Sequence, residues 1–249
     1  RGLVESRGAQ HVKVGVCDSD GIMRGKYISR DKFISSLDGG FGFCDVVLGW
    51  DCQDQLYDNV QYTGWHTGYP DAPVRLLPDA CRTLPFEDNG LFFLGEFSPP
   101  GEAVCSRGLL RRVLERGRAM GFEAYVGFEY EFFVFKETPE SVREKSYRGL
   151  TPMAPGWFGY SVIRNSTGNA FYRQLLDHCR DMDMAIEGLH EETGPGVMEA
   201  AITVDKALAA ADKAALFKTF GKVIAQENGF MATFMAKCSR DWPGQSGHI

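Results

Sequence analysis

Two acidic side chains stand close together in a segment that is otherwise mostly apolar. Glu129 and Glu131 lie two positions apart within residues 123–135, which are rich in aromatic and β-branched residues and therefore predict a strand. Alternate residues of a strand point to one face, so the two carboxylates project together with Cα atoms about 7 Å apart. Two such anions at 4 Å repel by roughly 4 kcal/mol at an effective dielectric constant of 20. The pair predicts a bound cation, and the alternative is a solvated edge strand with two exposed acids.

A second acidic pair adds to the first. Residues 186–192 and 197–203 predict two strands joined by the turn TGPG at 193–196. A turn of this length places Glu192 and Glu199 on one face as diagonal neighbours about 7–8 Å apart, close enough to share an ion. The alternative is the solvated rim of a hairpin.

One imidazole completes the set of candidate ligands. His248 follows a glycine-rich run at 244–247, where a histidine without any metal role is the alternative. Carboxylate oxygens with a single imidazole suit Mg²⁺ or Mn²⁺ better than zinc, which favours thiolates and several imidazoles. The predicted metal ligands are therefore Glu129, Glu131, Glu192, Glu199 and His248.

Composition excludes several other classes of protein. The 249 residues are 44% hydrophobic and carry a net charge of -6, so they provide material for cores but no basic field that would hold a phosphate backbone. No apolar run approaches the roughly 18–20 residues that span a bilayer, and the first ten residues contain no hydrophobic stretch typical of a secretion signal. We expect no nucleic-acid partner, no membrane and a cytoplasmic location.

The elements that must position these residues fall into two regions. The first hundred residues predict short strands and turns, with a strand, a turn and a strand over 12–29, a β-rich run at 43–51 and a proline-containing loop region from 70 to 85. A breaker at 98–101 predicts a domain boundary near residue 100.

The second region mixes helices with strands but shows no strict βαβ alternation, which favours an α+β fold with antiparallel pairs. Its expected elements, besides the three strands already named, are a helix capped by Ser106 that ends before Gly121, a helix over 166–182, a helix over 205–228 capped by Asp205, and a strand over 230–238.

Three motifs occur in a recognisable order. They are FEYEFF at 128–133, EGLHEETGPGVME at 187–199 and FMAKCSRDWPGQSGHI at 234–249. Together with an Ala-Ala-Asp-Lys helix at 210–213, this order resembles the glutamine synthetase superfamily over residues 12–249. The resemblance implies a small β-grasp-like N-terminal domain (1–100). It also implies a catalytic domain (101–249) with a curved, largely antiparallel sheet flanked by helices, truncated at the C-terminus.

The resemblance also implies how the ligands divide between ions. Glu131, Glu192 and Glu199 correspond to ligands of one divalent ion, and Glu129 and His248 to ligands of a second ion beside the phosphates. Mg²⁺ or Mn²⁺ would be present at two or more ions per site, with ATP as co-substrate.

Further site residues follow from the same resemblance. Gly244 corresponds to a contact with substrate glutamate, Tyr160 to a residue near the amine pocket, and Glu187 to a nucleotide contact. Asp51 corresponds to the acid that a neighbouring subunit supplies to deprotonate the amine, and it shares the predicted catalytic role with Glu192.

The implied activity is an ATP-dependent carboxylate–amine ligase that forms a γ-glutamyl phosphate and then a γ-glutamyl amide from glutamate and ammonia or a larger amine. Family members assemble as stacked rings, so a homo-oligomeric double ring of 10 or 12 subunits is expected. Within the family we favour the γ-glutamyl-amine ligases.

Several departures from the family pattern bear on the amine. Val197 replaces a glutamine, Cys238 replaces a proline, and the run Asp51-Cys52-Gln53-Asp54 replaces a DGSS signature. An acidic stretch of this kind can receive a larger cationic amine, or it can be a solvated loop. Two other functions remain open: a non-catalytic relative with a structural or regulatory role, and a phosphotransferase that acts on a carboxylate other than glutamate.

Overall fold

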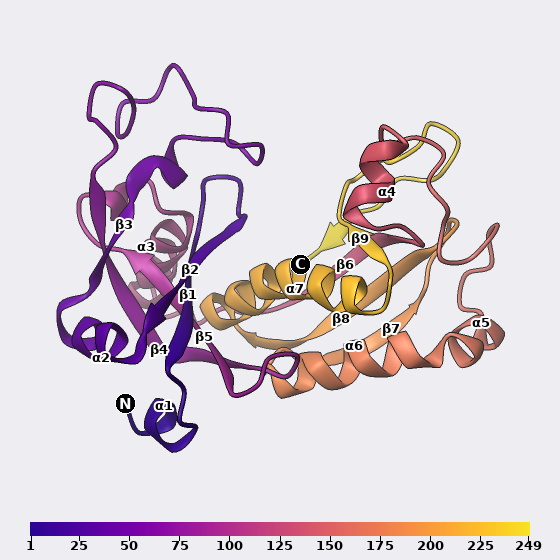
Figure 1. The fold of residues 1–249 in the computed structure, drawn as a ribbon, viewed down its shortest axis with the longest axis horizontal. Coiled ribbons are helices and arrows are strands. Elements are labelled where there is room, and N and C mark those ends of the chain that lie inside the picture. Colours follow the sequence, from indigo (N-terminus) through magenta and orange to yellow (C-terminus); the bar gives the residue numbers. More distant parts are fainter. The chain divides into compact units, whose positions relative to one another are not determined.

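The computed structural model describes all residues from Arg1 to Ile249, and they form two compact units (Figure 1). The first unit contains Arg1–Ala124 and Ala207–Ala215, and the second contains Tyr125–Lys206 and Leu216–Ile249. Each unit has one β-sheet with helices, which confirms the predicted α+β class. The domain boundary near residue 100 stays a prediction.

The first unit contains a five-stranded sheet in the order β2-β1-β5-β4-β3. Its strands are β1 (His11–Cys17), β2 (Met23–Ser29), β3 (Phe41–Cys44), β4 (Asp71–Leu84) and β5 (Gly90–Phe97), and its helices are α1 (Gly2–Ser6), α2 (Arg30–Gly39) and α3 (Ser106–Ala119).

The connections in this sheet have the β-grasp-like character predicted for the N-terminal region. β1 and β2 form an antiparallel hairpin, and β1 pairs in parallel with β5 at the centre of the sheet. Helix α2 packs on the sheet through Phe33, whose ring lies 4.4 Å from that of Phe93, centroid to centroid. Both rings are almost fully buried, so this contact anchors the helix over the core.

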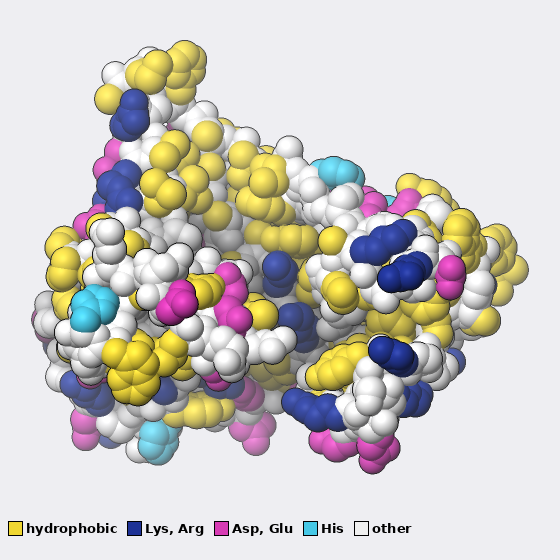
Figure 2. Space-filling view, turned by 90° about the horizontal axis from the view of Figure 1, so that it is seen from above, with side chains coloured by type: hydrophobic (Ala, Val, Ile, Leu, Met, Phe, Trp, Pro, Cys, Tyr) yellow, Lys and Arg dark blue, Asp and Glu magenta, His cyan; other side chains and the backbone are white.

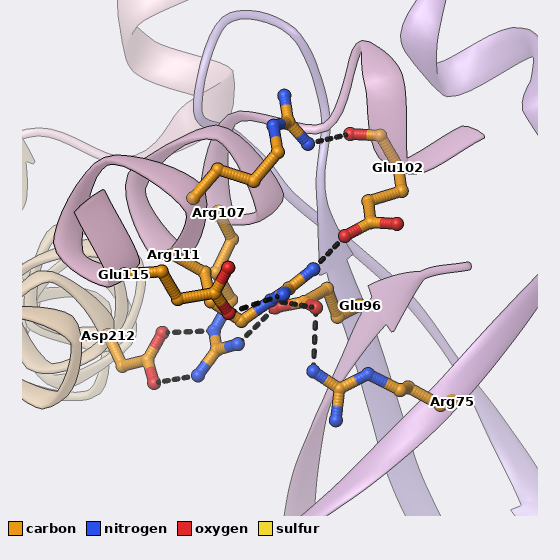
Figure 3. A network of polar contacts seen from close by, with 8 residues as sticks. Arg75, Glu96, Glu102, Arg107, Arg111, Glu115 and Asp212 are labelled. Carbon is orange, nitrogen blue, oxygen red and sulfur yellow. Dashed lines mark hydrogen bonds and ion pairs between the residues drawn. The ribbon is translucent and has the colours of Figure 1, made fainter. Parts of the chain in front are cut away.

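A buried ionic network joins β5 and α3 to the first turns of helix α7 (Ala207–Glu227) within this unit (Figure 3). Glu96 is 1% exposed and accepts hydrogen bonds from Arg75, at 2.7 Å, and from Arg107. Arg107 also donates two bonds to Asp212, at 2.8 and 2.9 Å. Burial alone would raise the pKa of Glu96, but these guanidinium bonds hold it below its usual range.

The second unit contains the other sheet, in which β10, β6, β8 and β7 follow one another and β9 also pairs with β6. Every pairing in it is antiparallel. The strands are β6 (Tyr125–Phe135), β7 (Ile186–Glu191), β8 (Val197–Lys206), β9 (Met231–Thr233) and β10 (Gly247–His248), and the helices are α4 (Pro139–Glu144), α5 (Val162–Thr167), α6 (Asn169–Asp181) and the second part of α7.

The two faces of this sheet have different chemistry because side chains alternate along each strand. Tyr130 and Phe132 of β6 face α7, where Phe217 lies 6.0 and 5.9 Å from their ring centroids. Met198 and Ala200 of β8 are completely buried. Residues of the opposite parity, including both acids of β6, therefore lie on the face away from α7.

Two predictions for the first hundred residues were wrong. The run 43–51 is a strand only as far as Cys44, because the next residues form a 3-10 helix in which buried Asp45 accepts a 2.7 Å bond from Thr63. The proline-containing region after residue 70 is largely the long strand β4. Its register shifts between Leu76 and Cys81, and this irregularity accommodates Pro78, which has no N–H for a ladder bond.

The predicted elements of the second region exist, but several ends differ. Neither Ser106 nor Asp205 caps a helix: the caps are Cys105 and Lys206, and neither makes a side-chain cap bond. Gly168 divides the expected helix over 166–182 into α5 and α6. The strand predicted over 230–238 is limited to β9.

Two further features concern the distribution of surface charge and the hydrophobicity of the helices. On the face drawn in Figure 2, basic and acidic side chains are interspersed and do not form a field of one sign. No helix combines the length and the apolar character that crossing a bilayer requires.

The ionic network yields a stability prediction. Replacing Arg107 by methionine leaves Glu96 and Asp212 without their shared cation in a mostly buried site, so we expect the free energy of unfolding to fall by about 3 kcal/mol. Urea denaturation measures this. Arg118→Met, at an exposed position in the last turn of α3, is the control and should change stability by less than about 0.5 kcal/mol. Equal effects of the two substitutions would show that the network contributes nothing.

Candidate active site

Strand register brings the predicted acids onto one surface of the second sheet. Glu131 of β6 lies directly opposite Glu199 of β8, and Glu199 in turn lies opposite His190 of β7. Side chains of residues paired in this way project to the same face. Glu129, two positions before Glu131, shares that face.

The end of the chain closes one side of this surface. β10 pairs with β6 so that His248 lies opposite Glu129, and His248 Nδ1 is 3.2 Å from Glu129 Oε2. The predicted approach of these two residues is therefore present. Both side chains are substantially exposed, at 61% for His248 and 44% for Glu129.

A third group gathers on the other side of the surface. Ligand atoms of His190, Glu192 and Glu199 all lie within 4.8 Å of one another. The two carboxylates were expected to meet. His190 was not identified from the sequence, although its position two residues before Glu192 on a predicted strand already placed both side chains on one face. Its Nε2 atom is buried and has no hydrogen-bond partner.

Glu131 differs from the other acids in its present contacts. We expected its carboxylate to converge with those of Glu192 and Glu199, but it is not part of that group. Glu131 Oε2 instead accepts a 2.8 Å bond from the Ser246 N–H, and the Glu131 N–H donates to Ser246 O at 3.0 Å. The segment that carries His248 is thus attached to β6 at Glu131.

The turn between β7 and β8 holds the register of both acids. The Glu192 N–H donates to Val197 O at 3.0 Å, which closes the turn. Gly196 has φ +68, and a Cβ atom there would lie 2.5 Å from Val134 O and 2.9 Å from Met153 N. Only glycine combines this backbone conformation with so close an approach to two other segments.

Burial and the charges of neighbouring acids raise two pKa values in this group. The pKa of Glu199 is raised by burial, and then by the negative charges of Glu129, Glu131 and Glu192, against an opposing effect of His190. The pKa of Tyr160 is raised chiefly by Glu192, with smaller effects of desolvation and of the other acids. The acids therefore behave as one interacting cluster.

The donor set fits divalent cations. Four carboxylates and two imidazoles lie on one face: those of Glu129, Glu131, Glu192, Glu199, His190 and His248. Burial and the neighbouring acids raise the pKa of Glu199, and His190 Nε2 has no hydrogen-bond partner. A bound cation would stabilise the ionised carboxylate and satisfy the nitrogen atom. Hard oxygen donors with imidazole are the ligands that Mg²⁺ or Mn²⁺ accept.

Three more predicted residues lie in the second unit. The ring of Tyr160 stacks on His190 with centroids 4.3 Å apart, so Tyr160 is beside the cluster. Glu187 is exposed at the point where the β7–β8 register shifts, next to Gly188, and a bulge of this kind redirects a side chain. Gly244 is exposed and directly precedes Gln245, whose N–H donates to Ala236 O at 2.7 Å.

Asp51 lies in a loop of the first unit, where its carboxylate already has partners. Oδ1 accepts bonds from the N–H groups of Gln53, at 2.8 Å, and Gln55, at 2.9 Å. Arg24 stabilises the same loop with bonds to Asp51 O, at 3.1 Å, and to Asp54 Oδ1, at 2.6 Å. One oxygen of Asp51 therefore organises its own loop, and the other has no such bond.

A sequence comparison identifies the family, and a structure comparison finds the same fold. The family model "Glutamine synthetase, catalytic domain" matches residues 103–249. A GmaS–ADP complex shares the fold, with a TM-score of 0.79 at 18% identity over 99% of this chain and 55% of its own. The chain belongs to the glutamine synthetase family.

Similar proteins of known name are ligases. The type-1 glutamine synthetase 2 of Dictyostelium discoideum is 44% identical over 241 residues, which are 96% of this chain and 46% of that protein. The glutamate–isopropylamine ligase of a Pseudomonas species is 32% identical over 256 residues, which are 100% of this chain and 55% of that protein. The chain thus spans about half the length of the curated relatives it matches.

The raised pKa of Glu199 predicts an unusual pH effect. An acid whose pKa is raised in the folded state destabilises that state above its unfolded pKa, where it is ionised, and ceases to do so below it. Glu199→Gln should therefore raise the melting temperature of the metal-free protein at neutral pH, by roughly 2–4 °C if burial of the ionised carboxylate beside the other acids costs about 1 kcal/mol. The gain should disappear near about pH 4.

Differential scanning fluorimetry of the two proteins across this pH range makes the measurement, with the exposed Glu144→Gln as the control. In addition, Mn²⁺ should stabilise the wild-type protein more than Glu199→Gln. A variant that melts lower than wild type at neutral pH without metal would show that ionised Glu199 does not destabilise the folded state.

The turn yields a second prediction, with a control already present in the chain. Gly196 and Gly156 have similar φ values of +68 and +62, but a Cβ atom at Gly156 would meet nothing within 4 Å. Gly156→Ala should cost about 1–2 kcal/mol from the backbone conformation alone. Gly196→Ala should cost more, because the new methyl group displaces Val134 or Met153, and it should also weaken Mn²⁺ binding. Equal costs in urea denaturation would refute the steric argument.

Proposed function

We propose that this chain carries the metal-binding half of an ATP-dependent carboxylate–amine ligase. The observation that carries the proposal is the convergence of four carboxylates and two imidazoles on one sheet face in a member of the glutamine synthetase family. Glutamate would be activated as γ-glutamyl phosphate, and ammonia or a larger amine would then displace phosphate.

The residues would hold divalent ions in two groups. Glu131, Glu192 and Glu199 would bind one, with His190 beside Glu192 and Glu199, and Glu129 and His248 would bind another. When bound, Mg²⁺ or Mn²⁺ would neutralise the phosphoryl oxygens and align them with the attacking carboxylate. Each site would hold two or more ions.

Other residues of the chain would position the substrates. The exposed backbone of Gly244 would contact glutamate, and Glu187, at its bulge, would contact the nucleotide. Tyr160 would form part of the amine pocket, where its stacking on His190 fixes the ring beside the acids. Positioning of this kind needs no nucleophilic serine or cysteine, because the carboxylate of the substrate is itself the nucleophile.

Asp51 would remove the proton from the amine, supplied by one subunit to the site of its neighbour in a double ring of 10 or 12 subunits. The oxygen that makes no bond within its loop is suited to this role, since the other is engaged by Gln53 and Gln55. A monomeric full-length protein in solution scattering would remove Asp51 from this role.

The amine substrate would be larger than ammonia. The replacement of small polar residues by Asp51-Cys52-Gln53-Asp54 favours an amine larger than ammonia. The similar proteins include both kinds, since one is named a glutamine synthetase and the other a glutamate–isopropylamine ligase. A phosphotransferase acting on another carboxylate would use the same ions and differ only in the substrate pocket.

The proposal predicts a specific loss of activity. Full-length protein with Mg-ATP and glutamate should release phosphate when an amine is added, and a panel that includes ammonia, isopropylamine and ethanolamine identifies the amine. Glu131→Gln should lower this rate by about 100-fold or more, because a bound cation is worth several kcal/mol to the transition state. Glu144→Gln is the matched control on the same unit.

Two outcomes would reject the ligase. No stimulation by any amine, together with the same background rate in Glu131→Gln, would favour the non-catalytic relative. Stimulation that requires a carboxylate other than glutamate would favour the alternative phosphotransferase.

A further inference from the structure

A cavity of about 340 Å³ lies in the second unit on the side of the sheet away from the acid cluster. Glu191 lines it, and since Glu191 alternates with His190 and Glu192 along the chain, its side chain points to the opposite face. Met153, Phe171 and Phe230 supply an apolar lining. Its size and its mainly apolar wall with a few polar groups are typical of small-molecule sites.

The charges in this cavity do not balance. Glu191, only 4% exposed, is paired with Arg164 at 3.3 Å and accepts a 3.3 Å bond from the Tyr172 hydroxyl. Arg164 also donates to Pro155 O. Lys136 lines the same cavity, is exposed and forms no ion pair. One positive charge is therefore left over after the buried pair has been counted.

We propose that this cavity binds a small monocarboxylate with an aromatic or aliphatic body, as a regulatory site separate from the acid cluster. The carboxylate would pair with Lys136, and the body would lie against Met153, Phe171 and Phe230. Lys136 is the one cationic group of the cavity without a carboxylate partner in the protein, so a single carboxylate is the anion that matches it.

The chain offers a short connection from this cavity to the cluster. The Tyr160 N–H donates to Glu191 O at 2.8 Å, and the Tyr160 ring stacks on His190. Tyr160 directly precedes Ser161, the N-cap of α5, and Arg164 belongs to α5. A ligand that moves Arg164 or Glu191 would thus shift Tyr160 and His190. This coupling rests on the proposed metal role of the cluster, whereas binding in the cavity does not.

Binding is tested with 3-phenylpropionate as the probe and 3-phenylpropanamide as its neutral counterpart, on full-length metal-free protein by ligand-observed NMR titration. The amide should bind at least about tenfold more weakly, the ratio expected from loss of one charge-assisted hydrogen bond. Lys136→Met should reduce affinity for the acid by a similar factor. Lys32→Met, which removes an exposed charge from α2, should leave it unchanged.

A second variant tests whether the probe binds inside the cavity. Ala154 is 7% exposed and lines the cavity, so Ala154→Trp should fill it and abolish binding. If Ala154→Trp does not fold, Lys136→Met still decides, because Lys136 is exposed and its replacement does not disturb the core. Equal affinities for acid and amide, or full affinity in Lys136→Met, would overturn the proposal.

The coupling has its own readout. Mn²⁺ binding, followed by the electron paramagnetic resonance of free Mn²⁺, should change at least twofold in saturating probe, and Ala154→Trp or Lys136→Met should remove the effect. If the probe binds and Mn²⁺ binding is unchanged, the regulatory part is overturned and the site stands. If Mn²⁺ does not bind at all, the proposed function fails. The NMR titration still decides whether the cavity binds the probe.

Discussion

The mutual repulsion of carboxylates on one sheet face is the constraint on which the second unit depends. Four acids share this surface, and the charges of Glu129, Glu131 and Glu192 add to the effect of burial in raising the pKa of Glu199. Such a cluster persists only when the scaffold holds it by other means. The opposite face supplies them, because Phe217 of α7 packs on Tyr130 and Phe132, and residues such as Met198 are fully buried. The apolar face fixes the strands, and the strands fix the acids.

The sequence predicted most of this arrangement because alternation along strands is a local property. The placement of Glu129 with Glu131, and of Glu192 with Glu199, follows from spacing and turn length alone. The contact between Glu129 and His248 could not be derived in this way, because it joins positions 119 residues apart, and only the family resemblance indicated it. Their roles as metal ligands stay predictions.

The errors have identifiable physical causes. His190 was overlooked because a lone histidine carries no signal of its own, and its role in the site emerges only when Glu199 is placed opposite it. The long strand β4 was mistaken for a loop because a proline such as Pro78 is rarely found inside a strand. The irregularity that accommodates Pro78 depends on the pairing of β4 with β5, which the sequence does not reveal. Helix caps at Ser106 and Asp205 were wrong because the neighbouring strand or loop, rather than a side chain, sets where each helix begins.

The length of the Thr193–Gly196 turn limits which evolutionary changes this region can accept. Side chains alternate with a period of two, so one inserted or deleted residue would leave Glu192 on the helix-covered face while Glu199 stayed where it is. Val197, the first residue of β8, directly follows the turn and is fully buried, so it fixes the end of the turn against the core. Lineages of this protein should therefore keep both Gly196 and the length of the turn, and codon gains and losses in it should be selected against.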